Sequence, residues 1–158
     1  GALDRVIVSG NRLMNLVGHG IHITTRVGHA QVRDNVVENV VGGALIMSPG
    51  AAAEYLAVEG NRFVNLGFGF NHESLPFFGV LLLATRRADV TGNLFANVGR
   101  QAVVNPLRAA LMTMAVGELR VAGNRMFGIG PLASFNQRAV GIAIAPGFTI
   151  GSKACSRQ

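Results

Sequence analysis

The sequence predicts an all-β solenoid, and three observations lead to this prediction. A nine-residue phrase recurs five times: an apolar residue, two polar or small residues, Asn, three further residues, a second Asn and an apolar residue. Successive copies are separated by roughly 24 to 32 residues, which is within the range typical of stacked repeats. Apolar residues alternate within each copy with a period of two, which is typical of strands rather than helices.

The five copies cover most of the chain. In the fifth copy Gly128 takes the place of the second Asn. The copies are Val8–Leu16, Val32–Val40, Val58–Leu66, Val90–Val98 and Val121–Ile129.

Each coil is expected to contain three short strands. The first strand carries alternating apolar residues such as Val6 and Val8 and ends at a corner such as Gly10-Asn11. Gly and Asn suit this corner because both tolerate a left-handed backbone. A second strand follows, and a small residue then opens a third, at Gly20–Ile23, Gly43–Ile46, Gly79–Leu82, Ala110–Thr113 and Gly141–Ile144.

The repeat length varies mainly after the second Asn, in segments 66–78, 99–108 and 130–139. Insertions at one position of a coil project from one side of a solenoid, which is often the working side. The alternative is that long loops cost little entropy and have no role.

Composition narrows the class of protein. Of 158 residues, 49% are apolar and only 14% are charged, which excludes a disordered chain. One cysteine, Cys155, excludes a disulfide scaffold and reads as incidental. No apolar run is long enough to span a bilayer, and no signal peptide is visible. We expect one β-helix domain, residues 1–158, with 151–158 as tail or cap, as a module of a longer protein.

The net charge of +6 comes from thirteen arginines and a single lysine against eight acidic residues. An anionic partner such as an acidic polysaccharide would fit this charge. The alternative is that scattered arginines keep an apolar protein soluble. No run of five basic residues occurs and aromatic residues do not interleave with the arginines, so nucleic acid is not the expected partner.

The repeated Gly-Asn corner with three strands per coil resembles the right-handed parallel β-helix proteins of the pectate-lyase-like class. The resemblance covers about residues 4–150. It implies a right-handed winding and an extracellular or surface location, although the residues themselves indicate no compartment. It also implies a stacked ladder of the first asparagines, Asn11, Asn35, Asn61, Asn93 and Asn124.

Alternation predicts an apolar outer face on the third strand of each coil. Soluble monomers rarely leave such a patch open. We expect it to be covered by another copy of the chain, by a neighbouring domain of the parent protein, or by loop 66–78. The residues assigned to this apolar face are Leu45, Met47, Leu81, Leu83, Met112 and Met114.

The arginines suggest a second kind of surface. Arg12, Arg62 and Arg125 are expected to point outward from the second strand, but Val36 and Leu94 interrupt the stripe, as on a solvated face. If the chain binds or cleaves an acidic polysaccharide, the arginines expected to contact it are Arg12, Arg62, Arg100 and Arg108.

Enzymes of this class carry catalytic groups outward on the third strand or its flanking loops. Glycoside hydrolysis needs two carboxylates across the sugar bond, and lyase chemistry needs a base and a cation. The outward rows contain no acid. Gly18-His19-Gly20 looks like a polygalacturonase stretch, but the accompanying Asn-Thr-Asp, Asp-Asp and Arg-Ile-Lys stretches are missing, so His19 is predicted to be a turn residue.

Neither a metal site nor a catalytic relay is expected. His19, His22 and His29 are close in sequence but are not expected to converge on one ion. His72-Glu73-Ser74 lies within a single loop, whereas a relay needs residues from separate segments. No cofactor is expected. The sequence thus predicts a non-enzymatic structural or binding module. The alternative is a carbohydrate-active protein. If that protein is an enzyme, it would be a polysaccharide lyase or a glycoside hydrolase.

Overall fold

The computed structural model describes residues 2–68, 76–100, 107–130 and 139–145. The described residues form three parallel sheets, each with one strand from every coil. The first sheet contains β1 (Leu3–Ser9), β4 (Arg26–Arg33), β7 (Ala52–Glu59), β10 (Thr85–Thr91) and β13 (Glu118–Ala122). The second contains β2 (Arg12–Leu16), β5 (Val36–Val40), β8 (Arg62–Leu66), β11 (Leu94–Val98) and β14 (Arg125–Ile129). The third contains β3 (Ile21–Ile23), β6 (Leu45–Met47), β9 (Phe77–Leu83), β12 (Arg108–Met114) and β15 (Ala139–Ala145).

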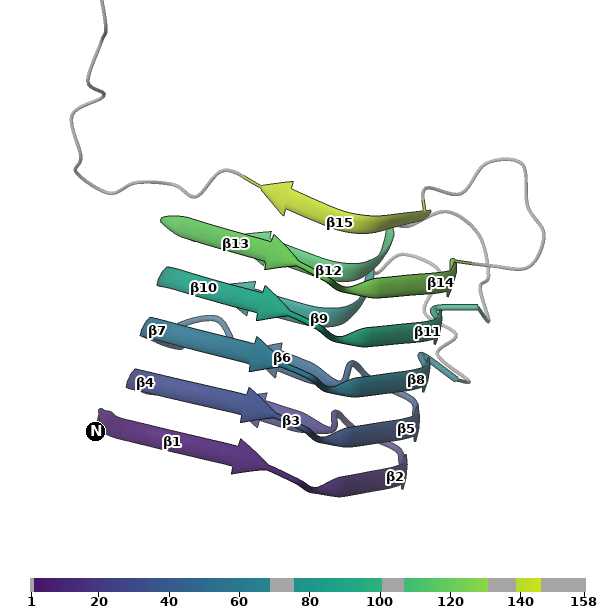
Figure 1. Ribbon diagram of the computed structural model, residues 1–158, viewed down its shortest axis with the longest axis horizontal. Helices are drawn as coiled ribbons and strands as arrows, with labels where there is room; N and C mark the ends of the chain where they lie inside the picture. The colour runs from purple at the N-terminus through teal and green to yellow at the C-terminus, as the bar shows by residue number, and fades with distance from the viewer. Residues whose placement is uncertain (1, 69–75, 101–106, 131–138, 146–158) are drawn as a thin grey trace, which may run out of the picture.

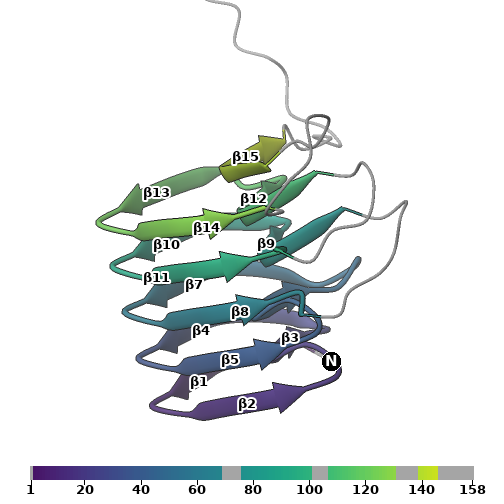
Figure 2. The same cartoon turned by 90° about the vertical axis from the view of Figure 1, so that its right-hand side faces the viewer.

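The chain winds as a right-handed parallel β-helix of five coils, which confirms the predicted fold. Each strand pairs in parallel with the strand one coil above or below it (Figure 1). Figure 2 shows the second sheet nearest the viewer. Its strands run from left to right while the chain rises from coil to coil, which is a right-handed winding. The described residues contain no helix long and apolar enough to cross a membrane.

The interior is a continuous apolar column. Each sheet contributes inward residues that stack on their equivalents in the next coil, as Val32 does on Val58. Phe63 and Phe95 stack with ring centroids 5.2 Å apart. Because all three sheets bury one face against this column, the period-two apolar pattern in the sequence is explained directly.

The corner between the first and second sheets differs in detail from the sequence prediction. Only its first residue takes a left-handed backbone, at Gly10, Asp34, Gly60, Gly92 and Gly123. The asparagine that follows does not, so its side chain is free to turn inward. The second asparagine of the phrase is left-handed instead, with φ between 53° and 57° at Asn15, Asn39, Asn65 and Asn97.

The first asparagines form the expected ladder, and its middle members are buried. Asn35 shows the pattern: its backbone N–H and its Nδ2 each donate to Asn61 Oδ1 at 3.0 Å. Its Nδ2 also donates to the Val8 carbonyl oxygen at 2.9 Å. Every rung therefore ties two coils together, and buried amide groups are satisfied without water.

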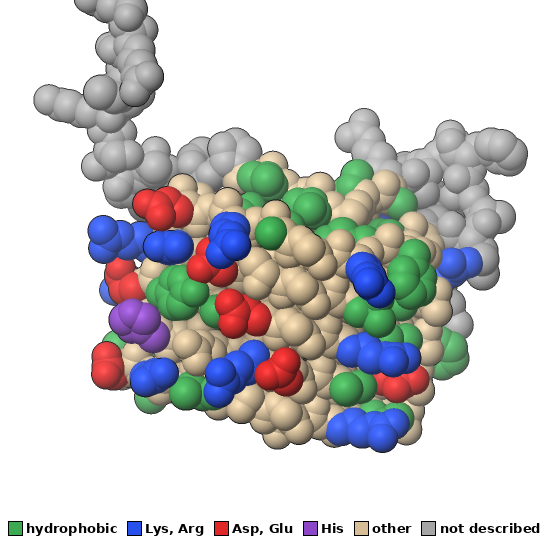
Figure 3. Space-filling view, viewed as in Figure 1, with side chains coloured by type: hydrophobic (Ala, Val, Ile, Leu, Met, Phe, Trp, Pro, Cys, Tyr) green, Lys and Arg blue, Asp and Glu red, His purple; other side chains and the backbone are tan. Residues whose placement is uncertain are grey.

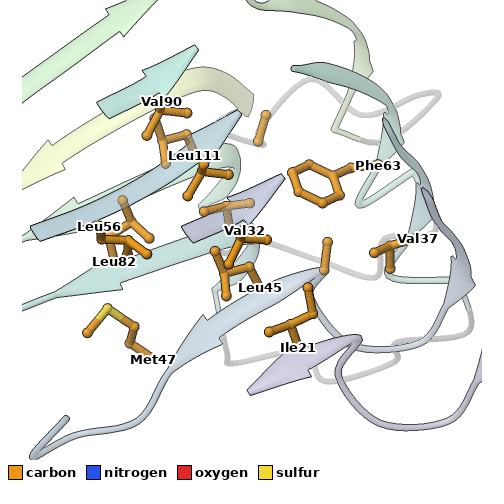
Figure 4. Packing of buried hydrophobic residues seen from close by; sticks show 14 of the residues in the cluster. Ile21, Val32, Val37, Leu45, Met47, Leu56, Phe63, Leu82, Val90 and Leu111 are labelled. Atoms are coloured by element: carbon orange, nitrogen blue, oxygen red, sulfur yellow. The ribbon is translucent and has the colours of Figure 1, made fainter. Parts of the chain in front are cut away.

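The predicted orientation of β6 was wrong by one residue. Leu45 pairs with Ile21 and Val80, so Leu45 and Met47 point into the core and are fully buried (Figure 4). Ile46 faces outward in their place. Three consecutive small residues, Gly42-Gly43-Ala44, precede this strand. Because any of them could open the strand, the sequence does not fix which of its residues point inward. A one-residue slip exchanges the two faces of a strand.

Candidate functional site: a groove along the second corner

A groove of about 820 Å³ follows the corner between the second and third sheets. It runs along the helix axis across four coils, so its wall repeats from coil to coil. Its lining residues are Asn15, Leu16, Val17, Asn39, Val41, Asn65, Leu66, Gly67, Phe68, Asn97 and Arg100.

A second asparagine ladder lies in this groove. Asn39 Nδ2 donates to Asn15 Oδ1 at 3.2 Å, Asn65 Nδ2 donates to Asn39 Oδ1 at 2.9 Å, and Asn97 Nδ2 donates to Asn65 Oδ1 at 3.0 Å. A primary amide has two N–H groups and an oxygen with two lone pairs. Within the described residues, Asn39 and Asn65 therefore each keep one donor and one acceptor position that the ladder does not use. Asn15 keeps both donors, and Asn97 keeps both acceptor positions.

The backbone of the same corner is already committed to bonds between coils. Val41 N–H donates to the Leu16 oxygen, and Gly67 N–H donates to the Val40 oxygen. Gly99 and Gly130 repeat these bonds higher up the helix. A ligand in the groove would consequently be recognised by side chains, not by adding a strand to the backbone.

The fifth place of this ladder is occupied differently. Gly128 replaces the asparagine, and its φ of 63° is left-handed like those of the four asparagines below it. A Cβ at Gly128 would lie 2.6 Å from Asn97 Oδ1 and 2.8 Å from a terminal nitrogen of Arg100. Arg100 thus places its guanidinium where a fifth amide would stand, at one end of the groove.

Apolar side chains flank the amides. Val17 is 85% exposed and Phe68 is 60% exposed, although both are large hydrophobic residues. Exposed aliphatic and aromatic groups beside polar side chains are typical of surfaces that bind amphipathic ligands. The groove therefore combines a row of amides, apolar contact area and one cation.

A polar cluster lies on the outer face of the first sheet. Ala53 and Leu56 are both buried, so the two residues between them, Glu54 and Tyr55, both face outward. Tyr55 donates its hydroxyl to Asp89 Oδ2 at 2.8 Å. This hydrogen bond to a carboxylate, and then burial, raise the pKa of Tyr55, so the phenol stays protonated and acts as a donor.

Two arginines complete this polar cluster. Arg87 lies 3.8 Å from Asp89 Oδ2 and packs with its guanidinium carbon 5.8 Å from the Tyr55 ring centre. Arg86 pairs with Glu54 at 3.6 Å. Charged side chains of both signs gather over this sheet (Figure 3). They neutralise one another and form a mixed, solvated face.

The structure separates the four arginines that the sequence suggested for an anionic ligand. Arg100 lines the groove, whereas Arg12 and Arg62 lie on the outer face of the second sheet. Arg108 is only 1% exposed and packs against Gly99, and burial lowers its pKa. The prediction of Arg108 as a surface ligand was wrong because β12 turns this side chain away from solvent.

The histidines form no three-residue metal group within the described ranges. His19 lies in the connection between β2 and β3, where its Nδ1 accepts a hydrogen bond from the Gly43 N–H at 3.1 Å. Burial and then the charge of His22 lower the pKa of His19. His22 is a neighbour, with ring centroids 5.3 Å apart, and contacts Ser48 Oγ at 2.7 Å. His29 lies elsewhere, beside Tyr55.

Other predicted features fall outside the described residues. These are the His72-Glu73-Ser74 stretch, Cys155, the tail 151–158 and the central parts of the three insertions. The groove itself was missed at the sequence level. The sequence nevertheless contains a pattern that could have predicted the groove, because the second Asn of the repeated phrase supplies the four amides that line the groove.

Comparison of the chain with models of protein families, with curated proteins and with solved structures finds no match. Function is therefore inferred from the surfaces of the β-helix.

Proposed function

We propose that this protein is a non-enzymatic β-helix module that binds an extended polysaccharide along the groove at its second corner. One observation carries the proposal: four asparagine side chains, one per coil, line a groove that also exposes Val17, Phe68 and Arg100. Sugar hydroxyls both donate and accept hydrogen bonds, which matches the donor and acceptor positions that the ladder leaves unused among the described residues.

The spacing of the amides favours a sugar chain over a peptide. Rungs repeat at the separation of neighbouring strands, about 4.8 Å, whereas an extended peptide advances about 3.3 Å per residue. Three peptide residues span about 9.9 Å and two rungs about 9.6 Å, so an extended peptide would match only every second rung. A polysaccharide carries hydroxyls on both edges along its whole length, so some hydroxyl is within reach of every rung.

The groove is better suited to binding than to catalysis. Among the residues that the structure describes, its lining side chains are amides, aliphatic and aromatic groups and one guanidinium. Glycoside hydrolysis would need two carboxylates facing each other across the bond. The Tyr55 phenol, whose pKa is raised, is held as a donor in the polar cluster of the first sheet and is unsuited to act as a base.

We also infer membership of the pectate-lyase-like class of β-helices. The right-handed winding, the three parallel sheets and the buried asparagine ladder support this assignment. An extracellular or surface location follows from the same resemblance. Within that class this chain would be a member that binds a polysaccharide.

The groove can be tested with a panel of neutral and acidic polysaccharides, including mannan, laminarin and polygalacturonate, by calorimetry. Val17→Asp and Phe68→Ala are each expected to weaken binding about tenfold, because each removes apolar contact area at the groove. Ile7→Asp is the matched control, since Ile7 is also exposed but lies on the first sheet. Absence of binding across the panel, or equal losses in Val17→Asp and Ile7→Asp, would overturn the proposal.

A second function, contact with another protein chain through the third sheet, is supported by a separate observation. Ile46, Leu81, Leu83 and Met114 lie on the outer face of that sheet and remain partly exposed. Another copy of the chain or a neighbouring domain would be the partner. The mass of the protein in solution distinguishes self-association from a monomer.

A further inference from the structure

Three arginines form a straight line on the outer face of the second sheet. Parallel register places Arg12 beside Val36, Val36 beside Arg62, Arg62 beside Leu94 and Leu94 beside Arg125. We call these five residues the arginine row. Figure 3 shows Lys/Arg side chains in a column at the right, with hydrophobic side chains and one acidic side chain among them. The aliphatic residues that seemed to interrupt a stripe thus alternate with arginine in a regular way.

The spacing of the row follows from the sheet. Arginine occurs in every second coil, so neighbouring guanidinium groups start from backbone positions two strand separations apart, or about 9.6 Å. At physiological ionic strength the Debye length is about 8 Å. The three like charges therefore repel one another only weakly, and the row can be kept without opposite charges beside it.

These arginines differ from those of the first sheet in their partners. Arg86 and Arg87 pair with Glu54 and Asp89. By contrast, in the part of the chain that the structure describes, no ion pair involves any of the three arginines in the row. The nearest polar contact is that of Arg12 Nε with Met14 Sδ at 3.0 Å. Glu38 is the single acidic residue on the five strands of this sheet. Glu38 faces outward on β5, between the strands of Arg12 and Arg62, but among the described residues it forms no ion pair with either arginine. The row thus keeps a net positive charge.

Apolar surface accompanies the charges. Val36 and Leu94 are partly exposed between the arginines, and Phe127, on the strand of Arg125, is 55% exposed. Aliphatic and aromatic groups of this kind pack against the C–H faces of sugar rings. The face therefore offers alternate ionic and apolar contacts along one line.

We propose that the arginine row binds an acidic polysaccharide in which every second sugar carries an anionic group. A chain whose two-sugar repeat is about two strand separations long, or about 9.6 Å, would bring one carboxylate to each arginine. The uncharged sugar between would then lie over Val36 or Leu94. A polymer with a charge on every sugar would place half of its anions over the aliphatic residues, which is unfavourable because those anions would lose water without a partner.

Nucleic acid and membranes fit the row less well. Duplex DNA carries one phosphate per 1.7 Å of its axis and 3.4 Å along each strand, so its charges are far denser than the row. An anionic lipid surface would require a flat cationic area, whereas the row is one residue wide. The proposal concerns a surface separate from the groove and does not rest on the groove being occupied.

The test compares binding of four probes to the whole protein by calorimetry at low and physiological salt. The probes are hyaluronan fragments, which carry one carboxylate per two sugars, polygalacturonate, which carries one on every sugar, short duplex DNA, and phosphatidylserine vesicles. Hyaluronan is expected to bind most tightly. Arg12→Gln, Arg62→Gln and Arg125→Gln should each weaken its binding about threefold, and the triple variant about thirtyfold.

Two controls make the result specific to the row. Arg33→Gln removes the same charge from an exposed position on the first sheet and should change hyaluronan binding less than twofold. The double variant Val36→Arg and Leu94→Arg gives one arginine per coil. It should shift the preference toward polygalacturonate, because the charge spacing then matches that polymer.

Several outcomes would overturn the proposal. The first is that hyaluronan does not bind. The second is that Arg33→Gln weakens hyaluronan binding as much as the row variants do, since this would show a response to net charge alone. Tighter binding of DNA or vesicles through the same arginines would assign the row to a different partner. Weaker hyaluronan binding in Arg12→Gln, Arg62→Gln and Arg125→Gln but not in Arg33→Gln would assign the binding to the row, whatever the groove variants do.

Discussion

At the scale of single residues, the buried carboxylate of Asp89 depends on one phenol. Asp89 is only 6% exposed, and its Oδ2 accepts the Tyr55 hydroxyl at 2.8 Å. Within the described residues its Oδ1 has no hydrogen-bond partner. Arg87 contributes charge from 3.8 Å at a more exposed position. Burial of a carboxylate is costly unless donors replace the lost water, so Tyr55 is the main compensating group.

Tyr55→Phe is therefore expected to lower the free energy of unfolding by about 1–3 kcal/mol, because the carboxylate loses its direct donor. Urea denaturation measures the change, and Arg87→Gln should cost less because that ion pair is partly solvated. The difference in free energy of unfolding between the parent and Tyr55→Phe should stay constant below pH 10, the ordinary pKa of tyrosine, and become smaller above it. The sign follows because the unfolded phenol loses its proton first as the pH rises. A pH-independent difference, or none, would contradict this account.

At the scale of elements, the two asparagine ladders run in opposite directions. In the first ladder the lower coil donates, as Asn11 Nδ2 does to Asn35 Oδ1. In the second the upper coil donates, as Asn39 Nδ2 does to Asn15 Oδ1. The first ladder continues through all five coils, whereas the second stops at Gly128, where Arg100 occupies the next place.

This arrangement predicts that positions 100 and 128 are energetically coupled. Gly128→Asn should destabilise the parent protein by about 1–2 kcal/mol, because the new side chain meets the Arg100 guanidinium and Asn97 Oδ1. In an Arg100→Ala background the same change should be neutral or stabilising, since the left-handed backbone suits Asn and the amide can extend the ladder. A double-mutant cycle by denaturation should give a coupling of at least about 1 kcal/mol. Additive effects would show that the two side chains do not compete for one place.

At the scale of the whole molecule, some features follow from the sequence because polar markers fix them. The register of the first two sheets could be predicted because Asn35 and its equivalents lose several buried hydrogen bonds if a strand slips. The third sheet has no such marker, and the small residues before Leu45 allow two starting points, so its β6 face was misassigned. The burial of Arg108 and the pairing of Tyr55 with Asp89 depend on contacts between coils that no local pattern encodes.

The corrected outer face of the third sheet determines how the whole molecule should behave in solution. It keeps Leu81, Leu83 and Met114, the last 41% exposed, and gains Ile46. Met112, beside Leu81, is buried at 8% exposure and offers little contact surface. Burying a few hundred Å² of such surface contributes several kcal/mol at about 25 cal/mol per Å², enough for weak association but not for an obligate dimer. We expect light scattering after gel filtration to show a monomer–dimer equilibrium that shifts with concentration. Leu81→Asp should abolish the dimer, whereas Ile7→Asp, which adds the same charge to the first sheet, should not. A monomer at every concentration would remove self-association and leave a different chain as the partner of this face.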